Sequence, residues 1–205
     1  MSPRRDEQEY ESKRQQIIDA ALHVFASKGF EKATNKDIAG EAKIASPGLI
    51  YHYFQDKADL FRQVIQERAP ILQLLDHGDD LMDLPPREAL TMIGSAFLKM
   101  IENRHAVSMI KMVLGEATRR PAVAEMMSRI GPARGLAFLS HYLSHQMEIG
   151  ALKKVDPNAA ARCFIGPLAG YLLTREVFVV PGADSISPEL MLQTTIDIFL
   201  KGLEV

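Results

Sequence analysis

Cysteine, tryptophan and long apolar runs are scarce or missing in this chain of 205 residues. Because Cys163 is the only cysteine, no internal disulfide can form, which is typical of proteins in a reducing cytosol. No stretch approaches the roughly 20 consecutive apolar residues that a membrane-spanning helix needs. The first residues are polar and contain no apolar segment of a secretory signal. We therefore expect a cytoplasmic protein without a membrane partner.

Motifs of the common enzyme classes are also missing. The sequence has no glycine-rich phosphate loop, no G-x-S-x-G elbow and no H-E-x-x-H pair. Cys163 lies in an apolar stretch, where packing explains it better than nucleophilic chemistry. We therefore predict no enzymatic activity, no catalytic residue and no cofactor.

The net charge of −2 gives no indication of a nucleic-acid partner. Residues 1–60 carry nine basic and ten acidic side chains, and residues 61–205 carry fifteen and sixteen, so each part has a net charge of −1. A claim of DNA binding must therefore depend on where individual charges lie and not on their sum.

Helical periodicity is what the sequence does contain. Apolar residues recur at the spacing of an amphipathic helix, first at Ile17, Ala20, Ala21, Val24 and Phe25. Prolines at positions 86, 121, 157 and 188 are placed to open longer helices, and Pro70 is expected to kink or break one. With no sustained strand-like alternation, the pattern predicts an all-α chain of about nine helices.

Three short helices are predicted after Gly29, which ends the first helix. Thr34 has the spacing of a capping box with Asp37, Ser46-Pro47 is an N-cap followed by proline, and Asp56 caps the helix after that. Two short helices joined by a tight connection and preceded by a longer one follow the helix-turn-helix plan of DNA-binding proteins.

The segment ATNKDIAGEAKIASPGLIYHYFQDKADLF closely resembles the DNA-binding segment of the TetR family of bacterial transcriptional regulators. The matching features are Lys-Gly-Phe at 28–30, Thr34 before Asp-Ile-Ala, Tyr-His-Tyr-Phe at 51–54, and Lys57 followed by Leu60. The resemblance implies a flexible tail at residues 1–12, a three-helix DNA-binding domain at 13–60, and a larger helical domain at 61–205 for effector binding and dimerisation.

Several residues of this segment are candidates for DNA contact. A helix N-terminus near Thr34 attracts a phosphate, Tyr51 offers a hydroxyl, and Gly48 permits close approach of a backbone. Lys57 stands in the first turn of a helix, where a cation is unfavourable unless an anion joins it. The full candidate set is Thr34, Asn35, Lys36, Ser46, Pro47, Gly48, Leu49, Tyr51, His52 and Lys57.

These residues also have plainer interpretations. Tyr51 could be a packing aromatic and Lys57 a solvated charge. The reading helix has no Arg or Lys to bind guanine, so base contacts would fall to Pro47, Leu49 or His52. Arg4 and Arg5 could enter a minor groove or act only as solubilising charges. If Lys57 binds phosphate, Lys57→Ala weakens binding to all sequences and reduces its salt dependence.

Small residues line one side of the helix that starts at Pro157. The resemblance implies that this helix and the last one form a four-helix bundle with a second copy. The alternative is that both helices pack only within the monomer. The candidate dimer residues are Cys163, Gly166, Gly170, Thr174, Thr195 and Phe199.

Methionines and a histidine pair mark the middle helices. Methionine suits an adaptable apolar pocket but is also ordinary core filler. His141 and His145 have the i, i+4 spacing of a metal pair, but no Asp, Glu or Cys cluster completes a site, so no metal is predicted. The candidate ligand-binding residues are Met92, Phe97, Met100, Met109, Met112, Phe138, His141, Tyr142 and His145.

Together these features predict a homodimeric, sequence-specific DNA-binding regulator, cytoplasmic and nucleoid-associated when bound. Its partners would be a double-stranded, palindromic operator and a small, largely apolar effector that releases the repressor. The alternative is an architectural or protein-interacting DNA-binding factor without an effector.

Overall fold

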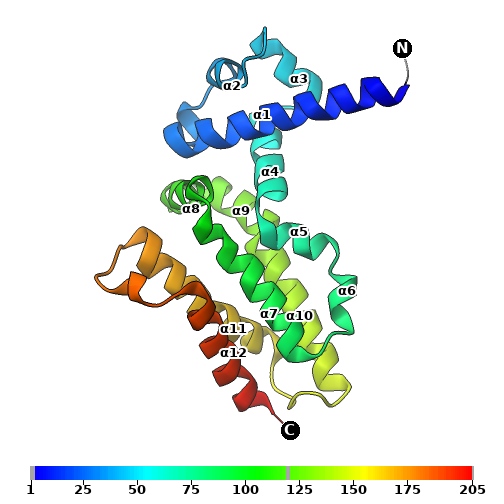
Figure 1. The fold of residues 1–205 in the computed structure, drawn as a ribbon, viewed down its shortest axis with the longest axis vertical. Coiled ribbons are helices and arrows are strands. Elements are labelled where there is room, and N and C mark those ends of the chain that lie inside the picture. The colour runs from blue at the N-terminus through cyan, green and yellow to red at the C-terminus, as the bar shows by residue number, and fades with distance from the viewer. Residues whose placement is uncertain (1–2, 119–120, 205) are drawn as a thin grey trace. The chain divides into compact units, whose positions relative to one another are not determined.

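A computed structural model describes residues 3–118 and 121–204, which contain helices and no strand (Figure 1). The all-α fold predicted from apolar periodicity is confirmed. The described chain divides into α1 to α12 and short 3₁₀ and π segments, so it is more finely divided than about nine helices. None of the described helices is long and apolar enough to cross a membrane.

The chain forms two compact units. Unit 1 comprises residues 1–68 and 104–124, and unit 2 comprises residues 69–103 and 125–205. The expected division at residue 60 differs from this because α8 (Arg104–Ala117) packs along α1 (Pro3–Lys32). The ring of His105 on α8 stacks on His23 of α1, with 4.1 Å between ring centroids.

The first helix begins at Pro3, where the sequence predicted a tail through residue 12. Side-chain hydrogen bonds at i, i+3 and i+4 spacing support its polar first turns, among them Arg14 to Glu11 and Gln15 to Glu11. The side chains of Arg4 and Arg5 lie outside what the structure describes. Helical backbone ends at Gly29, whose φ of 78° is one that glycine adopts without strain.

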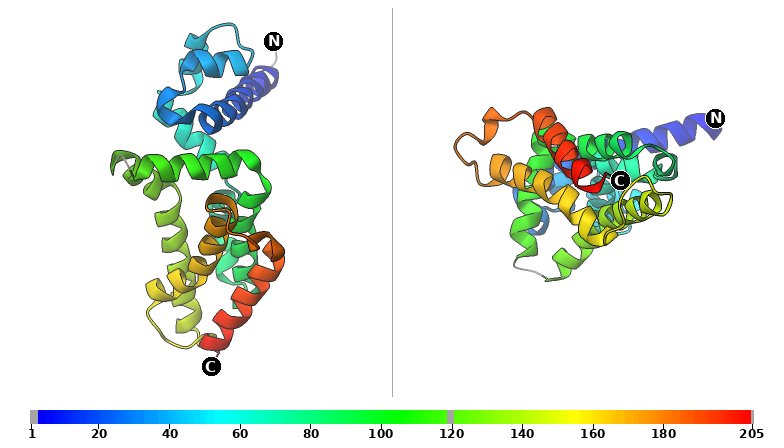
Figure 2. Two further views of the ribbon diagram at one scale, coloured as in Figure 1. Left: turned by 90° about the vertical axis from the view of Figure 1, so that its left-hand side faces the viewer. Right: turned by 90° about the horizontal axis from the view of Figure 1, so that it is seen from below.

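Shorter helices follow α1 in unit 1, and two of them, α2 and α4, contact it (Figures 1 and 2). They are α2 (Asn35–Glu41), a 3₁₀ turn (Pro47–Leu49) that continues into α3 (Ile50–Tyr53), and α4 (Lys57–Arg68). Helix α4 ends before Ala69, which is extended, and Pro70 opens α5, so the break expected at this proline is confirmed.

Unit 2 contains the remaining helices. The first are α5 (Pro70–Asp76), α6 (Asp79–Met82), α7 (Pro86–Leu98) and a 3₁₀ turn (Lys99–Glu102). Helix α9 (Pro121–Ile130) crosses the sequence boundary between the units and precedes α10 (Pro132–Glu148). The last are α11 (Pro157–Leu172), a π turn (Leu173–Val177), a 3₁₀ turn (Ala183–Ser185) and α12 (Pro188–Leu203).

The core of unit 2 is apolar and joins α7, α10, α11 and α12. Phe164 is fully buried, and its ring meets that of Phe199 at 5.4 Å. Helices α7 and α12 approach closely at Gly94, where an added Cβ would lie 2.3 Å from Leu192 Cδ1. This dense packing fixes which faces of α11 and α12 remain outside.

Candidate nucleic-acid interface

The reading helix is anchored to unit 1 by two buried side chains. Ile50 is the first residue of α3 and Phe54 is its C-cap, and the two side chains are 1% and 2% exposed. Between them Tyr51 is 62% exposed, so its ring is not a core aromatic. The packing interpretation of Tyr51 is therefore not supported, and a large polar-tipped ring faces out of the domain.

The exposed side of α2, the turn and α3 presents most of the residues predicted to contact DNA. Leu49 and Asn35 are half-buried, and the side-chain oxygen of Asn35 is buried with no hydrogen-bond partner among the described residues. An added Cβ at Gly48 would meet only Ser46 Oγ, at 3.4 Å, so internal packing does not require glycine there. The exposed members are Thr34, Lys36, Ser46, Pro47, Gly48, Tyr51 and His52.

Two of the predicted contact residues also hold the helices in place. Thr34 Oγ1 accepts a hydrogen bond from the Asp37 amide at 3.1 Å, and Asp37 accepts one from the Thr34 amide, which completes the predicted capping box. The Lys28 ammonium and Thr34 lower the pKa of Asp37 to about 2. Ser46 caps the 3₁₀ turn by accepting from the Gly48 amide at 3.1 Å.

The turn between α2 and α3 contains a residue with a positive φ, as Gly29 does at the end of the first helical stretch. Lys43 has a φ of 50°, in the left-handed region that residues with a Cβ seldom occupy. Its amide donates to the carbonyl of Gly40 at 3.2 Å, and the Ile44 amide donates to that of Ala39 at 3.1 Å. These bonds close the turn and set the angle between the two helices.

Lys57 has a different environment from the one expected for a phosphate ligand. Its ammonium donates to the carbonyls of Phe30, Glu31 and Ala33 at 2.8, 3.2 and 3.1 Å. It also lies 4.6 Å from the centre of the Phe30 ring. These carbonyls explain a lysine at this helix start, because they supply the partial negative charge that we assigned to DNA.

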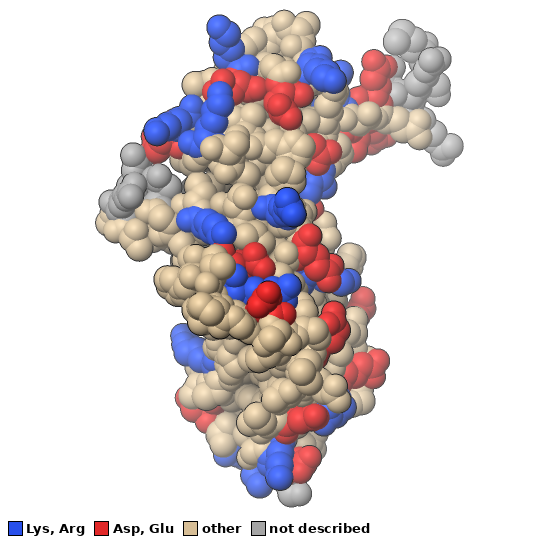
Figure 3. Space-filling model, turned by 60° about the vertical axis from the view of Figure 1, so that its left-hand side comes forward, with Lys and Arg blue, Asp and Glu red and all other residues tan. Residues whose placement is uncertain are grey.

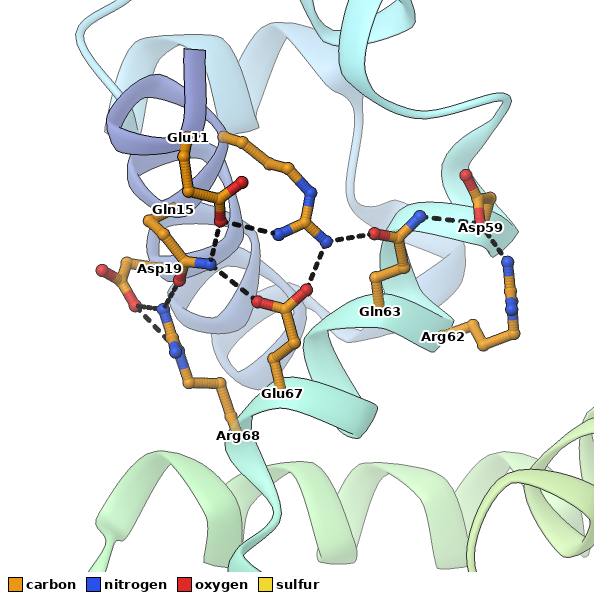
Figure 4. A network of polar contacts seen from close by, with 9 residues as sticks. Glu11, Gln15, Asp19, Asp59, Arg62, Gln63, Glu67 and Arg68 are labelled. Carbon is orange, nitrogen blue, oxygen red and sulfur yellow. Dashed lines mark hydrogen bonds and ion pairs between the residues drawn. The ribbon is translucent and has the colours of Figure 1, made fainter. Parts of the chain in front are cut away.

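A polar network joins α1 to α4, and sequence reasoning missed it (Figure 4). The Arg14 guanidinium donates to Glu11, Gln63 and Glu67, and Gln15 donates to Glu67 at 2.8 Å. Burial disfavours the ionised form of Glu67, but the hydrogen bonds from Arg14 and Gln15 outweigh it and lower the Glu67 pKa. Arg68 at the end of α4 pairs with Asp19 at 2.8 Å. The network fixes α4 to the helix that carries α2 and α3.

Tyr10 is a second residue that the sequence did not reveal, because it lies in the expected tail. Its ring contacts that of Tyr53 at 4.7 Å and that of His52, edge to face, at 6.0 Å. His52 also meets the Tyr53 ring at 5.3 Å. The exposed His52 imidazole is therefore held between two aromatic rings on the outward side of α3.

Charges of both signs intermingle on the face of the molecule shown in Figure 3. This distribution agrees with the net charge of −2. On this face, nucleic-acid contact by unit 1 would depend on local geometry rather than on a broad basic surface.

The residues predicted for a dimer interface fall into an outward and an inward set. Cys163, Gly166, Gly170 and Thr174 form an exposed face of α11. On α12, however, Thr195 is 6% exposed and donates to the Met191 carbonyl, and Phe199 packs on Phe164. The last two residues belong to the monomer core because the side of α12 that meets α7 and α11 includes them.

The outward side of α12 carries other apolar residues. Leu190 is 54% exposed and Ile198 is 71% exposed. Both follow the spacing of one helix face with Thr194, which is also exposed. Apolar residues thus lie on more than one side of this helix, and only packing decides which side is inside.

The predicted ligand residues do not gather in one unit. Met109 and Met112 lie on α8 in unit 1, and Met92 on α7 is 41% exposed. Tyr142 is fully buried, its hydroxyl donates to the Leu84 carbonyl at 2.7 Å, and burial raises its pKa. His141 is exposed. The members in unit 2 are Met92, Phe97, Met100, Phe138, His141, Tyr142 and His145.

Unit 1 also has an open recess that sequence reasoning did not anticipate. It has a volume of about 450 Å³ and lies among α1, α2 and α8. His23, Lys28, Glu41 and His105 are among its lining residues, and His23 Nδ1 lies 3.2 Å from Glu41. None of the predicted ligand residues lines this recess.

Family models match both parts of the chain. The model of the tetR family of bacterial regulatory proteins matches residues 17–64. The model of the C-terminal domain of AefR-like transcriptional repressors matches residues 88–202, which is more than half of the chain. The first match begins within α1 and ends within α4, and the second begins in α7 and ends in α12.

Curated relatives are transcriptional regulators. The chain is 33% identical to the repressor KstR2 of Mycolicibacterium smegmatis over 100 residues, which is 46% of each chain. It is 26% identical to the regulator YvkB of Bacillus subtilis over 194 residues, covering 91% of this chain and 95% of that one.

Solved structures share the fold. FadR from Bacillus subtilis, in complex with stearoyl-CoA, has a TM-score of 0.72 at 19% identity, with 92% of this chain and 98% of that chain covered. A TetR-family regulator from Mesorhizobium loti has a TM-score of 0.71 at 22% identity, with 95% and 98% covered.

Proposed function

Because this chain belongs to the tetR family of bacterial regulatory proteins, we propose that it represses transcription as a homodimer. Each copy places α3 in the major groove of a palindromic operator, and a small, largely apolar effector releases the protein. One observation supports this most: Tyr51 stands 62% exposed between the buried anchors Ile50 and Phe54. A helix packed on one side and free on the other suits insertion into a groove.

The DNA contacts divide by chemistry. Tyr51, Lys36 and the edge of the turn at Gly48 reach phosphates, which position the protein. His52, held by Tyr10 and Tyr53, faces base edges beside Pro47 and Leu49. Lys57 leaves the set of phosphate ligands, because its hydrogen bonds go to the carbonyls at the end of α1. Its effect on DNA binding is then indirect.

The dimer contact is the outward face of α11 and α12. Small residues on α11 allow two helices to approach closely, and Leu190 and Ile198 supply exposed apolar area. A two-fold axis would present the two α3 helices to half-sites about one helical turn, ~34 Å, apart. An architectural factor without an effector is not favoured, since the relatives are regulators.

The effector acts by differential affinity for two arrangements of the protein. Half-buried apolar side chains in the region matched by the repressor-domain model, such as Phe97, Met100 and Phe138, are the proposed contacts. Stearoyl-CoA, which the FadR structure contains, is the first compound to test as a releasing ligand.

The test begins with selection of bound DNA from a random pool. Affinity for the recovered sequence is then measured for wild type, Tyr51→Ala and the control Ile149→Ser, whose side chain is similarly exposed, at 61%, in unit 2. We expect Tyr51→Ala to weaken binding roughly tenfold or more at unchanged melting temperature, because a phosphate contact is lost and no packing is. Recovery of no preferred sequence, or equal affinity of the three proteins, would contradict the proposal.

A further inference from the structure

An apolar knob projects from unit 2 where α11 ends. Phe178, Val179 and Val180 are consecutive, and their exposed fractions are 69%, 68% and 45%. Ile186, just before α12, and Leu190, in the first turn of α12, are exposed to 41% and 54%. Five large apolar side chains thus face outward from one short stretch of chain, whereas single exposed residues need no explanation.

The backbone beneath the knob is unusual at two neighbouring places. Helix α11 widens into a π turn at Leu173–Val177, and Val179 then has a φ of 50°. A π turn is rare outside functional sites, and a β-branched residue rarely adopts a positive φ. Backbone strain of this kind is concentrated where a chain binds another molecule.

Hydrogen bonds hold the knob in its exposed position. The Phe178 amide donates to the Leu173 carbonyl at 2.9 Å, and the Val180 amide donates to the Thr174 carbonyl at 2.8 Å. The Tyr171 hydroxyl donates to the Ile186 carbonyl at 2.6 Å and accepts from Arg175 at 2.6 Å. The exposure is therefore built into the fold and does not come from a loose loop.

The knob continues the outward face of α11. Thr174, whose carbonyl binds the knob, is the last of the exposed small residues that include Gly166 and Gly170. A Cβ added at either glycine would meet nothing within 4 Å, so this face is open. The small-residue face of α11 and the knob adjoin each other. In a two-fold pair of copies, the knob of one copy could pack against the small-residue face of the other.

We propose that the knob packs against a second copy of this chain and forms the edge of its dimer interface. The proposal rests on the homodimer proposed above and names a contact that adds buried apolar area to its interface. A two-fold interface uses the same patch twice, so each copy both supplies a knob and receives one. Glu176, Asp184 and Glu189 lie in the same stretch of sequence as the knob, where Arg175 pairs with Glu176. The net negative charge of this stretch does not suit an anionic membrane surface.

The dissociation constant of the dimer tests the contact. Sedimentation equilibrium compares wild type with Phe178→Ser, Val179→Asn and the control Ile149→Ser. Asparagine keeps the left-handed backbone at position 179 but removes the methyl groups. We expect the dissociation constant to rise roughly hundredfold for Phe178→Ser and less for Val179→Asn, because an aromatic anchor is lost from both sides. Ile149→Ser should match wild type.

A labelling measurement covers the case of a variant that folds poorly. Phe178→Cys in a Cys163→Ser background is treated with a maleimide at concentrations above and below the dissociation constant measured for that variant. Slower modification at the higher concentration supports the knob contact, and equal rates overturn it. If the wild type is a dimer and Phe178→Ser has the same dissociation constant, the knob contact is overturned and the homodimer is not. A wild-type monomer that still selects a DNA sequence overturns the homodimer and leaves the DNA-reading face standing.

Discussion

Unit 1 and unit 2 both have an apolar core, but they differ in the polar contacts that cross between their helices. In unit 1, charged and polar side chains cross between helices: Arg14 reaches Glu67, Arg68 reaches Asp19, and Lys57 binds three carbonyls at and just after the end of α1. In unit 2, the core that joins α7, α10, α11 and α12 is apolar and few polar side chains are buried. The polar contacts between these helices include Arg87 to Asp197 and Ser140 to Asn158. Polar contacts are directional, so they fix helix angles, whereas apolar contacts tolerate repacking.

This difference suits two different tasks. A reading head must keep α3 at one angle to the groove, and the network of Figure 4 holds α1 and α4 in one register. A unit that responds to an effector must have two packings of similar free energy, which an adaptable apolar core allows. The same core leaves apolar side chains on the outward face of α11 and α12, where a second copy can cover them.

The largest effect should come from the apolar core of unit 2. Phe164→Ala removes a fully buried ring that packs on Phe199, and we expect the free energy of unfolding to fall by about 3–5 kcal/mol. Denaturant unfolding followed by circular dichroism measures it. Lys154→Ala, an exposed change in the same unit, should alter stability by less than about 0.5 kcal/mol. A loss below about 1 kcal/mol for Phe164→Ala would show that this core does not carry unit 2.

A smaller effect is expected from the polar network of unit 1. Arg14→Met keeps the apolar stem but leaves Glu67, which is partly buried, without its guanidinium partner. We expect a loss of about 1–3 kcal/mol in the free energy of unfolding, against less than about 0.5 kcal/mol for the neighbouring Lys13→Met. Thermal unfolding at neutral pH compares the three proteins.

The same network predicts a pH dependence. The folded pKa of Glu67 lies below its ordinary value of 4.5, so its contribution is complete above that value and is lost as pH falls through the folded pKa. The stability gap between wild type and Arg14→Met should therefore narrow in acid. A gap that is constant from neutral pH down to acid would mean that Arg14 acts through packing alone.

The smallest effect should come from Tyr10. Tyr10→Ala removes one of the two rings beside His52, and we expect operator affinity to fall about threefold to tenfold with little change in stability. Tyr10→Phe keeps the ring and should bind like wild type. In a double-mutant cycle, Tyr10→Ala should have no further effect once His52→Ala is present. Additive losses would mean that Tyr10 does not act through His52.

Local sequence rules predicted the reading head well. The capping box of Thr34 and Asp37, the proline start after Ser46 and the stop at Gly29 each depend on a few neighbouring residues. The pattern could not place Lys57, because its partners are carbonyls 24 to 27 positions earlier in the chain. It also missed Tyr10, because a polar helix end looks like a tail until a partner ring is known.

The C-terminal faces were harder to predict for a related reason. Helix α12 carries apolar residues on more than one side, so Phe199 and Ile198 look alike in sequence. Only contact with Phe164 shows that Phe199 is inside and Ile198 outside. Tyr142 likewise has the composition of a pocket residue, yet its hydroxyl satisfies the Leu84 carbonyl within the core. Long-range partners decide these positions.

In this account the exposed side of α3 binds DNA, and the outward face of α11 and α12 holds the dimer together. Sedimentation velocity of Tyr51→Ala with labelled operator tests this separation most directly. At a protein concentration where the wild type is dimeric and DNA-bound, the variant should sediment as a dimer, and the DNA should sediment free. A variant that still carries the DNA, or that loses DNA only because it has become a monomer, would contradict the claim.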